Sequence, residues 1–324
     1  MEENTEQRVD LTLFSEKIQE LKDQIASVIV GQEQTVDLVL AAILANGHVL
    51  IEGVPGVAKT LLARLTARLI DAEFSRIQFT PDLMPSDVLG TTVFNMKTND
   101  FDFHQGPIFA DIVLVDEINR APAKTQAALF EVMEERQISI DGITHKMGEL
   151  YTILATQNPV EQEGTYKLPE AQLDRFLMKI TMDYPSLEEE VDILERHHTN
   201  ASLIKLDDIK PAITKEELLS LRAFMNQVFV DRTLLQYIAL IVQQTRTSKA
   251  VYLGASPRAS VAMLQASKAY ALLQGRDFVT PEDIKFVAPY VLQHRLILTA
   301  EAEMEGYSPV KVTQRLIDKV EVPK

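Results

Sequence analysis

The chain has 324 residues, 46% of them hydrophobic, which is enough for two globular domains. The absence of cysteine excludes disulfides, thiolate metal sites and cysteine nucleophiles. With 47 acidic and 32 basic residues the net charge is -15, which disfavours nucleic acid and anionic lipid as partners.

The first elements alternate between helix and strand patterns. Apolar residues recur at helical spacing over residues 11–26 and 35–45, with a break at Val30 and Gly31 between them. The apolar run 48–52 predicts a strand, and residues 60–70 predict a helix. The glycine-containing segment between this strand and helix has the context that a phosphate-binding loop requires.

Four more strand-like runs follow, at residues 75–79, 112–115, 151–156 and 177–182. They alternate with helical or loop segments, which predicts an α/β fold with a parallel five-stranded sheet covered by helices on both faces. Two stretches, residues 91–103 and 137–146, alternate with period two around turn residues. We expect both to be β-hairpins inserted into the α/β core.

A second domain is predicted after the pattern loosens at residues 199–211. Beyond this stretch only helical periodicity is found, with helix starts at Thr214 and Thr280. We therefore expect an α/β nucleotide-binding domain over residues 1–200 and a small all-helical lid domain over residues 211–324.

The glycine-containing segment resembles the phosphate-loop pattern G-x-x-x-x-G-K-[ST], with Ala58 in place of the second glycine. Lys59 would place its ammonium on the β- and γ-phosphates, and the hydroxyl of Thr60 would reach Mg²⁺. A methyl group at position 58 is expected to be tolerated if the backbone φ stays negative. The alternative is a plain strand-to-helix turn with an incidental Lys-Thr pair.

Two acids end the buried strand predicted at residues 112–115. Ligands of open α/β sheets bind at this end of the strands. Asp116 would hold the Mg²⁺ shell, and Glu117 would polarise the attacking water, which is a role in hydrolysis. The alternative is a strand that simply ends in solvated acids.

Three further residues complete the candidate site. Asn158 follows an apolar strand, where its amide could contact both the γ-phosphate and the attacking water, although an asparagine before proline is often only a turn residue. Arg258 lies in the first turn of a helix whose N-cap is Ser256, so it could face phosphate. Arg175 precedes the last sheet strand and could reach the nucleotide of a neighbouring subunit.

Together these segments resemble the MoxR family of AAA+ ATPases. The matching segments are GVPGVAKT, VDEINRAPAKTQ, ATQNP, LPEAQLDRF and GASPRA, in that order between about residue 30 and residue 258. The resemblance implies binding of ATP and Mg²⁺, with the nucleotide held by Val30, Gly31, Gly53, Val54, Pro55, Gly56, Val57, Ala58, Lys59, Thr60 and Leu61. Asp116 and Thr60 are the implied metal ligands, and Glu117, Asn158, Arg175 and Arg258 the implied catalytic residues.

The resemblance also implies assembly and partners. Family members form rings, commonly hexamers, and resemble chaperones that remodel protein clients, often ones with von Willebrand factor A domains. The two hairpins would line the centre of such a ring. Gln78 resembles a residue that restrains Glu117, and Arg120 is a second arginine that a neighbour's nucleotide could contact, although an ion pair at a helix start is equally expected.

Two other functions stay open. One is a nucleotide-switched binding platform with slow turnover, and the other is a nucleic-acid motor, which the acidic charge disfavours. Because we find neither an apolar leader at Met1 nor an apolar run of about 18 residues, we expect a cytoplasmic protein with no membrane insertion.

Overall fold

The computed structural model describes residues 11–159, 164–199 and 209–322. In this part of the chain the α/β domain contains the strands β1 (Val49–Gly53), β2 (Phe74–Gln78), β5 (Ile112–Asp116), β8 (Thr152–Gln157) and β9 (Met178–Met182). Its helices are α1 (Leu11–Val28), α2 (Glu33–Leu44), α3 (Lys59–Leu69), α4 (Pro85–Leu89), α5 (Ala123–Glu135), α6 (Glu170–Leu173) and α7 (Leu187–His198). The short 3-10 helices η1 (Pro107–Phe109) and η2 (Ile118–Arg120) flank β5.

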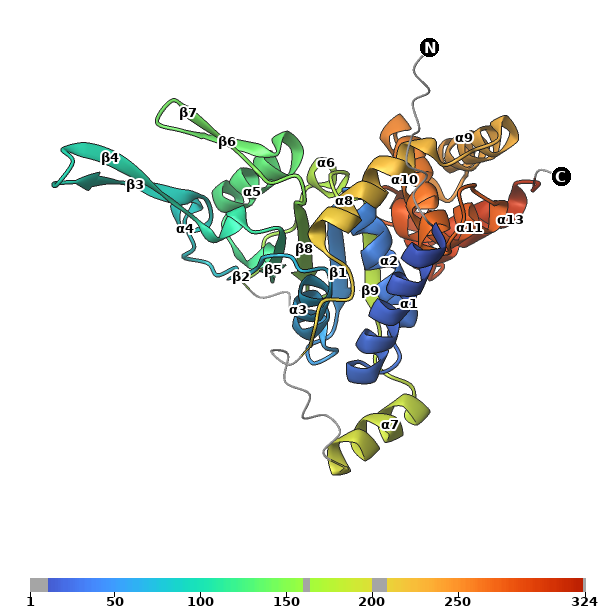
Figure 1. Ribbon diagram of the computed structural model, residues 1–324. Helices are drawn as coiled ribbons and strands as arrows, with labels where there is room; N and C mark the ends of the chain where they lie inside the picture. Colours follow the sequence, from blue (N-terminus) through green and yellow to red (C-terminus); the bar gives the residue numbers. More distant parts are fainter. Residues whose placement is uncertain (1–10, 160–163, 200–208, 323–324) are drawn as a thin grey trace, which may run out of the picture.

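The five strands form one parallel sheet in the order β2-β5-β8-β1-β9. Successive side chains of a strand point to opposite faces, so each strand feeds two cores. On β5, Ile112 and Leu114 pack with helices α1, α2 and α3, whereas Val113 and Val115 pack on the α5 side. Strands β5 and β8 are almost entirely buried because helices cover both faces of the sheet, as Figure 1 shows.

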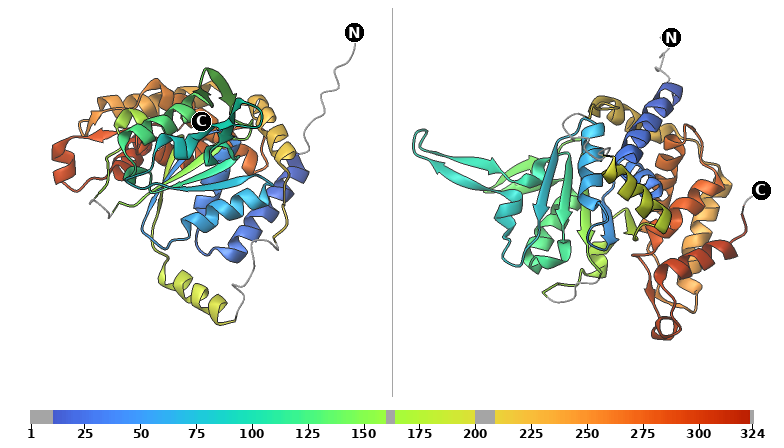
Figure 2. Two further views of the ribbon diagram at one scale, coloured as in Figure 1. Left: turned by 90° about the vertical axis from the view of Figure 1, so that its left-hand side faces the viewer. Right: turned by 90° about the horizontal axis from the view of Figure 1, so that it is seen from below.

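Two antiparallel hairpins extend from this core, as expected. They are β3 (Gly90–Asn95) with β4 (Asp100–Gln105), and β6 (Gln137–Ile140) with β7 (Ile143–Lys146). Asp141 and Gly142 both have positive φ, which makes the β6–β7 turn. A hydrogen bond of 2.6 Å from Thr92 Oγ1 to Asp141 Oδ2 joins the two hairpins. Figure 2 shows the β3–β4 hairpin reaching away from the body of the molecule.

The lid is mainly helical. It comprises α8 (Lys215–Phe224), η5 (Met225–Gln227), α9 (Arg232–Thr247), α10 (Pro257–Leu273), α11 (Pro281–Leu292), α12 (Ala300–Met304) and α13 (Pro309–Lys319). Thr214 and Thr280 cap α8 and α11 through capping boxes with Glu217 and Asp283, as their spacing predicts. Helix α10 also packs on α2, which joins the cores of the two domains.

The expectation of a lid with only helices was wrong in one detail. Strands β10 (Val251–Leu253) and β11 (Ile297–Leu298) pair antiparallel within it. Elements of two and three residues are too short to show a period of two, so the sequence does not reveal them. The loosened stretch 199–211 lies largely outside the described residues. None of the helices in the described parts has the length and apolarity that crossing a bilayer requires.

Candidate nucleotide-binding site

The candidate site lies at the carboxyl edge of the sheet. Because the strands are parallel, the residues that follow them meet at one edge. The phosphate loop follows β1, Asp116 ends β5, and Asn158 follows β8, which lies between these two strands. Gln78 ends β2, next to β5. The fold therefore brings together the loop, the acids and the asparagine that the sequence predicted.

The phosphate loop has the backbone that an anion cradle needs. Gly56 has a φ of 89°, and a Cβ there would meet open space, so the glycine serves conformation rather than packing. A Cβ on Gly53 would lie 2.7 Å from the carbonyl oxygen of Met182, which only glycine avoids. Helix α3 begins at Lys59, so its N-terminal amides face the loop.

Ala58 departs from our expectation. We expected a negative φ at this position, but Ala58 is left-handed, with φ 61° and ψ 22°, at the N-cap of α3. The turn from the loop into the helix needs this conformation, which glycine normally supplies. The methyl group of Ala58 is therefore tolerated although the backbone is left-handed, and our expectation of a negative φ was wrong.

The loop lysine and the two predicted magnesium ligands lie next to the phosphate loop. Lys59 Nζ donates to the carbonyl oxygens of Gly53 at 2.5 Å and Val54 at 3.3 Å, inside the loop. Thr60 Oγ1 lies 3.4 Å from Asp116 Oδ2, so a hydroxyl and a carboxylate converge next to the loop. Such oxygen donors suit Mg²⁺ held together with substrate phosphates, so these residues fit the nucleotide and the metal.

Asp116 has two further partners that the sequence did not suggest. Its Oδ2 accepts from Arg76 Nε at 3.0 Å and Nη2 at 2.8 Å, and its Oδ1 accepts from Thr156 Oγ1 at 2.6 Å. Arg76 Nη2 also donates to Gln78 Oε1 at 2.9 Å. Neither Arg76 nor Thr156 carries a motif, and only the register of β2 and β8 against β5 brings them to the acid.

Two side chains contact the carboxylate of Glu117. Gln78 Nε2 donates to Glu117 Oε2 at 2.8 Å, and Arg120 Nε lies 3.1 Å from the same oxygen. Glu117 itself has a left-handed backbone, with φ 57°, and its N–H donates to Thr156 Oγ1 at 3.0 Å. The predicted contact between Gln78 and Glu117 is thus present, and Arg120 forms the ion pair that was one of its two interpretations.

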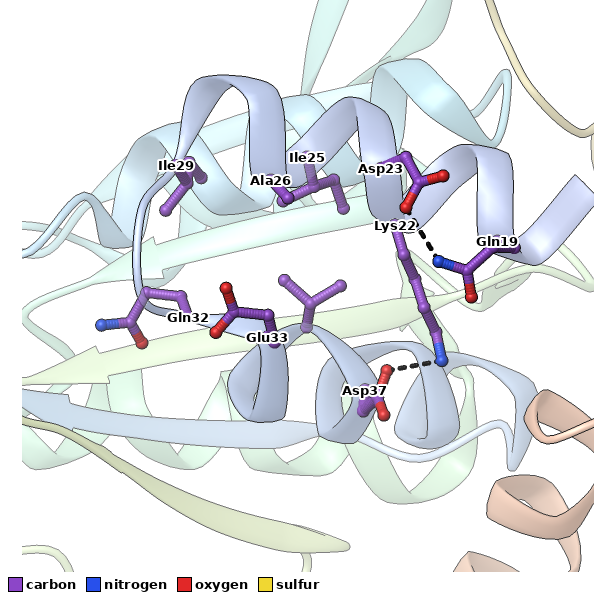
Figure 3. A pocket seen from close by; sticks show the side chains of 10 residues that line it. Gln19, Lys22, Asp23, Ile25, Ala26, Ile29, Gln32, Glu33 and Asp37 are labelled. Atoms are coloured by element: carbon purple, nitrogen blue, oxygen red, sulfur yellow. Dashed lines mark hydrogen bonds and ion pairs between the residues drawn. The ribbon is translucent and has the colours of Figure 1, made fainter. Parts of the chain in front are cut away.

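Val30 and Gly31 connect α1 to α2 next to the start of α7. Gly31 has a φ of 73°, and a Cβ there would lie 2.2 Å from Glu189 Oε1. A cavity of about 200 Å³ lies between α1 and α2 beside this segment, lined in part by Ile29 and Gln32 (Figure 3). Two of the residues that line this cavity, Lys22 and Asp37, form an ion pair with 2.7 Å between Nζ and Oδ1.

Arg175 and Arg258 lie elsewhere. Arg175 comes three residues before β9, whose start pairs with the start of β1. The phosphate loop follows the other end of β1, four strand residues further on, which is about 13 Å at roughly 3.3 Å per residue. Arg175 Nε instead bonds Glu134 Oε2 at 2.9 Å, and Arg258 Nη2 bonds Glu134 Oε1 at 3.2 Å. Both arginines therefore sit at the amino edge of the sheet.

Ser256 also differs from its expected role. It is the N-cap residue of α10, but its side chain does not cap the helix and lies 3.5 Å from Asp174 Oδ2 instead. The start of α10 is thereby tied to the segment that carries Arg175.

Comparison with known proteins agrees with this architecture. Residues 48–178 match the family model of the ATPase family associated with various cellular activities (AAA), and residues 243–318 match the AAA lid domain. Chaperone MoxR1 of Mycobacterium tuberculosis is 44% identical over 93% of this chain and 81% of its own length. The uncharacterized protein YeaC of Bacillus subtilis is 48% identical over 93% of both chains.

A crystal structure of a candidate ATPase from Cytophaga hutchinsonii is also similar, with a TM-score of 0.88, 40% identity and 97% coverage of both chains. The fold and the matches define a two-domain AAA+ ATPase. Within that class the chain belongs to the MoxR family, and both the predicted fold and the predicted ATPase activity are confirmed.

Proposed function

We propose that this chain is a Mg²⁺-dependent ATPase that works as a ring, commonly a hexamer, and uses hydrolysis to remodel protein clients in the cytoplasm. The observation that carries the proposal is the position of Arg175 at the edge of the sheet opposite its own phosphate loop. An arginine there completes a nucleotide site only on a neighbouring subunit. Clients with von Willebrand factor A domains are the class that the family resemblance suggests.

Each residue of the carboxyl edge then has a defined task. Lys59 binds the β- and γ-phosphates, and Thr60 and Asp116 hold Mg²⁺, which supplies positive charge against the phosphate oxygens when bound. Glu117 accepts a proton from the attacking water, and Asn158 orients that water. Gln78 and Arg120 must release Glu117 before it can act, because both contact its carboxylate.

The exposed apolar side chains of the β3–β4 hairpin support the proposal that the client is a protein. Its exposed side chains include Phe94, Met96 and Phe101, and the rings of Phe94 and Phe101 pack edge to face, 5.2 Å apart. A protruding apolar tip of this kind suits contact with protein surfaces. It offers few cations for a phosphate backbone, which argues against a nucleic-acid motor.

The deciding experiment mixes two variants, Lys59→Ala and Arg175→Ala, each expected to be inactive alone. The first keeps its arginine and the second keeps its nucleotide site, so ATPase activity should return in the mixture. Light scattering checks that the variants assemble together. If they co-assemble and activity stays absent, Arg175 does not act across subunits.

In that case a nucleotide-switched binding platform is the better description. The two restraints on Glu117 favour slow turnover, which is what such a platform requires. Client remodelling that keeps pace with ATP consumption would in turn exclude the platform.

A further inference from the structure

Glu134 is a residue without an assigned role at the centre of the amino edge. It lies near the end of α5, and its two carboxylate oxygens are divided between two arginines, Oε2 to Arg175 and Oε1 to Arg258. These arginines come from different domains, 83 residues apart in the sequence (258 minus 175). One carboxylate thus joins the α/β domain to the lid at the place where both arginines emerge.

Arg175 is fixed at both ends. Its guanidinium donates from Nη1 to the carbonyl oxygen of Phe130 and lies over the Phe130 ring, with 6.0 Å between the guanidinium carbon and the ring centroid. Its backbone is fixed by the buried Arg295, which bonds Asp174 Oδ1 at 2.6 Å and the carbonyl oxygen of Phe176 at 2.7 Å.

Arg258 is held more loosely. Its side chain is 64% exposed, and its contact with Glu134 is a single nitrogen at 3.2 Å. Without this contact a long exposed side chain would sample many rotamers, and ordering it at the moment of reaction would cost entropy. The contact with Glu134 therefore keeps Arg258 beside Arg175.

Arg175 borders open space. A cavity of about 300 Å³ adjoins it, lined by Phe130, Glu131, Glu134, Gln172 and Arg175 among others. The guanidinium groups of Arg175 and Arg258 are the donors that an incoming anion would meet, beside the carboxylates of Glu131, Glu134 and Glu135. An arrangement held by a carboxylate behind the arginines costs little reorganisation when the anion arrives.

We propose that Glu134 is a positioning residue that holds Arg175 and Arg258 as one clamp for the γ-phosphate of a neighbouring subunit. This inference rests on the proposed ring, in which Arg175 acts across subunits. Glu134 touches neither substrate nor metal and acts only through the two arginines. Its loss should therefore slow turnover and leave nucleotide binding at the same chain's phosphate loop unchanged.

The first test is Glu134→Gln, which keeps the side-chain shape and removes the charge. We expect kcat to fall about tenfold while the affinity for a fluorescent ATP analogue stays within about twofold. Glu131→Gln is the matched control, because Glu131 lines the same cavity and forms no ion pair within the described residues. Thermal unfolding verifies that both variants are folded. Full activity of Glu134→Gln would overturn the proposal.

Mixing assigns the defect to one side of the subunit boundary. In an equal mixture of Glu134→Gln with Lys59→Ala, about half of the intact nucleotide sites face an intact clamp, so activity per Glu134→Gln subunit should rise about fivefold. A mixture of Glu134→Gln with Arg175→Ala should show no gain, because both are damaged on the arginine side. A merely structural role for Glu134 predicts no rescue in either mixture.

The outcomes separate this inference from the ring itself. Failure of the Lys59→Ala and Arg175→Ala mixture would remove the ring proposal. Success of that mixture, together with no rescue of Glu134→Gln by Lys59→Ala, would remove only the role of Glu134.

Discussion

At the scale of single residues, Ala58 shows what the loop demands. A left-handed alanine costs about 1–2 kcal/mol relative to the right-handed conformation, and glycine does not pay this cost. The methyl group is partly buried against the larger core, which returns part of the loss. The sequence showed that a small residue was needed before Lys59, but it did not show the sign of φ, which depends on how the loop enters α3.

Ala58→Gly should therefore raise the free energy of unfolding, by about 0.5–1 kcal/mol after the extra entropy of glycine in the unfolded chain is counted. Nucleotide affinity should stay within about an order of magnitude of the unchanged protein, because the loop keeps its conformation. Thermal unfolding and titration with a fluorescent ATP analogue measure the two effects.

Ala58→Val is the opposite case. A β-branched residue resists the left-handed conformation, so both stability and nucleotide affinity should fall. A large loss of affinity in Ala58→Gly, by contrast, would mean that the methyl group makes a contact the site needs, and our steric account would be wrong.

At the scale of elements, two glycines close the base of the β3–β4 hairpin. Gly90 has a φ of 105°, and a Cβ on Gly106 would lie 2.5 Å from the Gly90 nitrogen and 2.3 Å from the carbonyl oxygen of Val88. Backbone atoms cannot give way as a flexible side chain can. A side chain at position 106 must therefore push the two strands apart where they leave the core.

Gly106→Ala should loosen this hairpin without unfolding the domain. We expect amide hydrogen exchange over residues 90–105 to become about tenfold faster or more, whereas β1 and β5 stay protected because their contacts are elsewhere. Gly148→Ala is the matched control, since a Cβ at Gly148 meets its nearest atom at an ordinary 3.4 Å. Unchanged exchange in Gly106→Ala would contradict the steric argument.

The elements that the sequence predicted are those with a strong local pattern. Strands β1, β5 and β8 are apolar runs bounded by turn residues, and the capped helices α8 and α11 start where their capping boxes predict. The loop, the two acids and Asn158 could be placed at the carboxyl edge for the same reason, because each stands at the end of a strand or in the segment that follows it. Glu134 could not, since its partners lie 41 and 124 positions away (175 and 258 minus 134) and no local pattern links them.

At the scale of the whole molecule, the two edges of the sheet carry different groups. The carboxyl edge holds the phosphate loop and the acids, and the amino edge holds the arginines with Glu134. In the proposed ring, the amino edge of one subunit would therefore face the nucleotide held at the carboxyl edge of its neighbour.

At the amino edge, His48 directly precedes β1 and links it to the neighbouring elements. Its Nδ1 accepts the N–H of Ile153 at 3.0 Å, and its Nε2 lies 3.1 Å from the carbonyl oxygen of Met133, to which it donates as the neutral ring. Burial, together with the nearby charge of Arg136, lowers the pKa of His48 from 6.5 to about 3. Burial likewise holds the pKa of His294 well below its usual value.

These histidines make stability depend on pH in a defined direction. Because the pKa of His48 is lower in the folded state, the unfolded chain binds more protons between pH 6.5 and pH 3, so stability is complete above pH 6.5 and falls as the solution is acidified. His48 alone should cost about 2–3 kcal/mol between pH 7 and pH 4.5. Urea unfolding at a series of pH values measures this slope.

The variant His48→Asn tests the assignment, because asparagine cannot titrate. It should be less stable than the unchanged protein at pH 7 yet lose less stability on acidification, with His294 supplying the remaining slope. An equal slope in both proteins would show that His48 is not the group that takes up the proton.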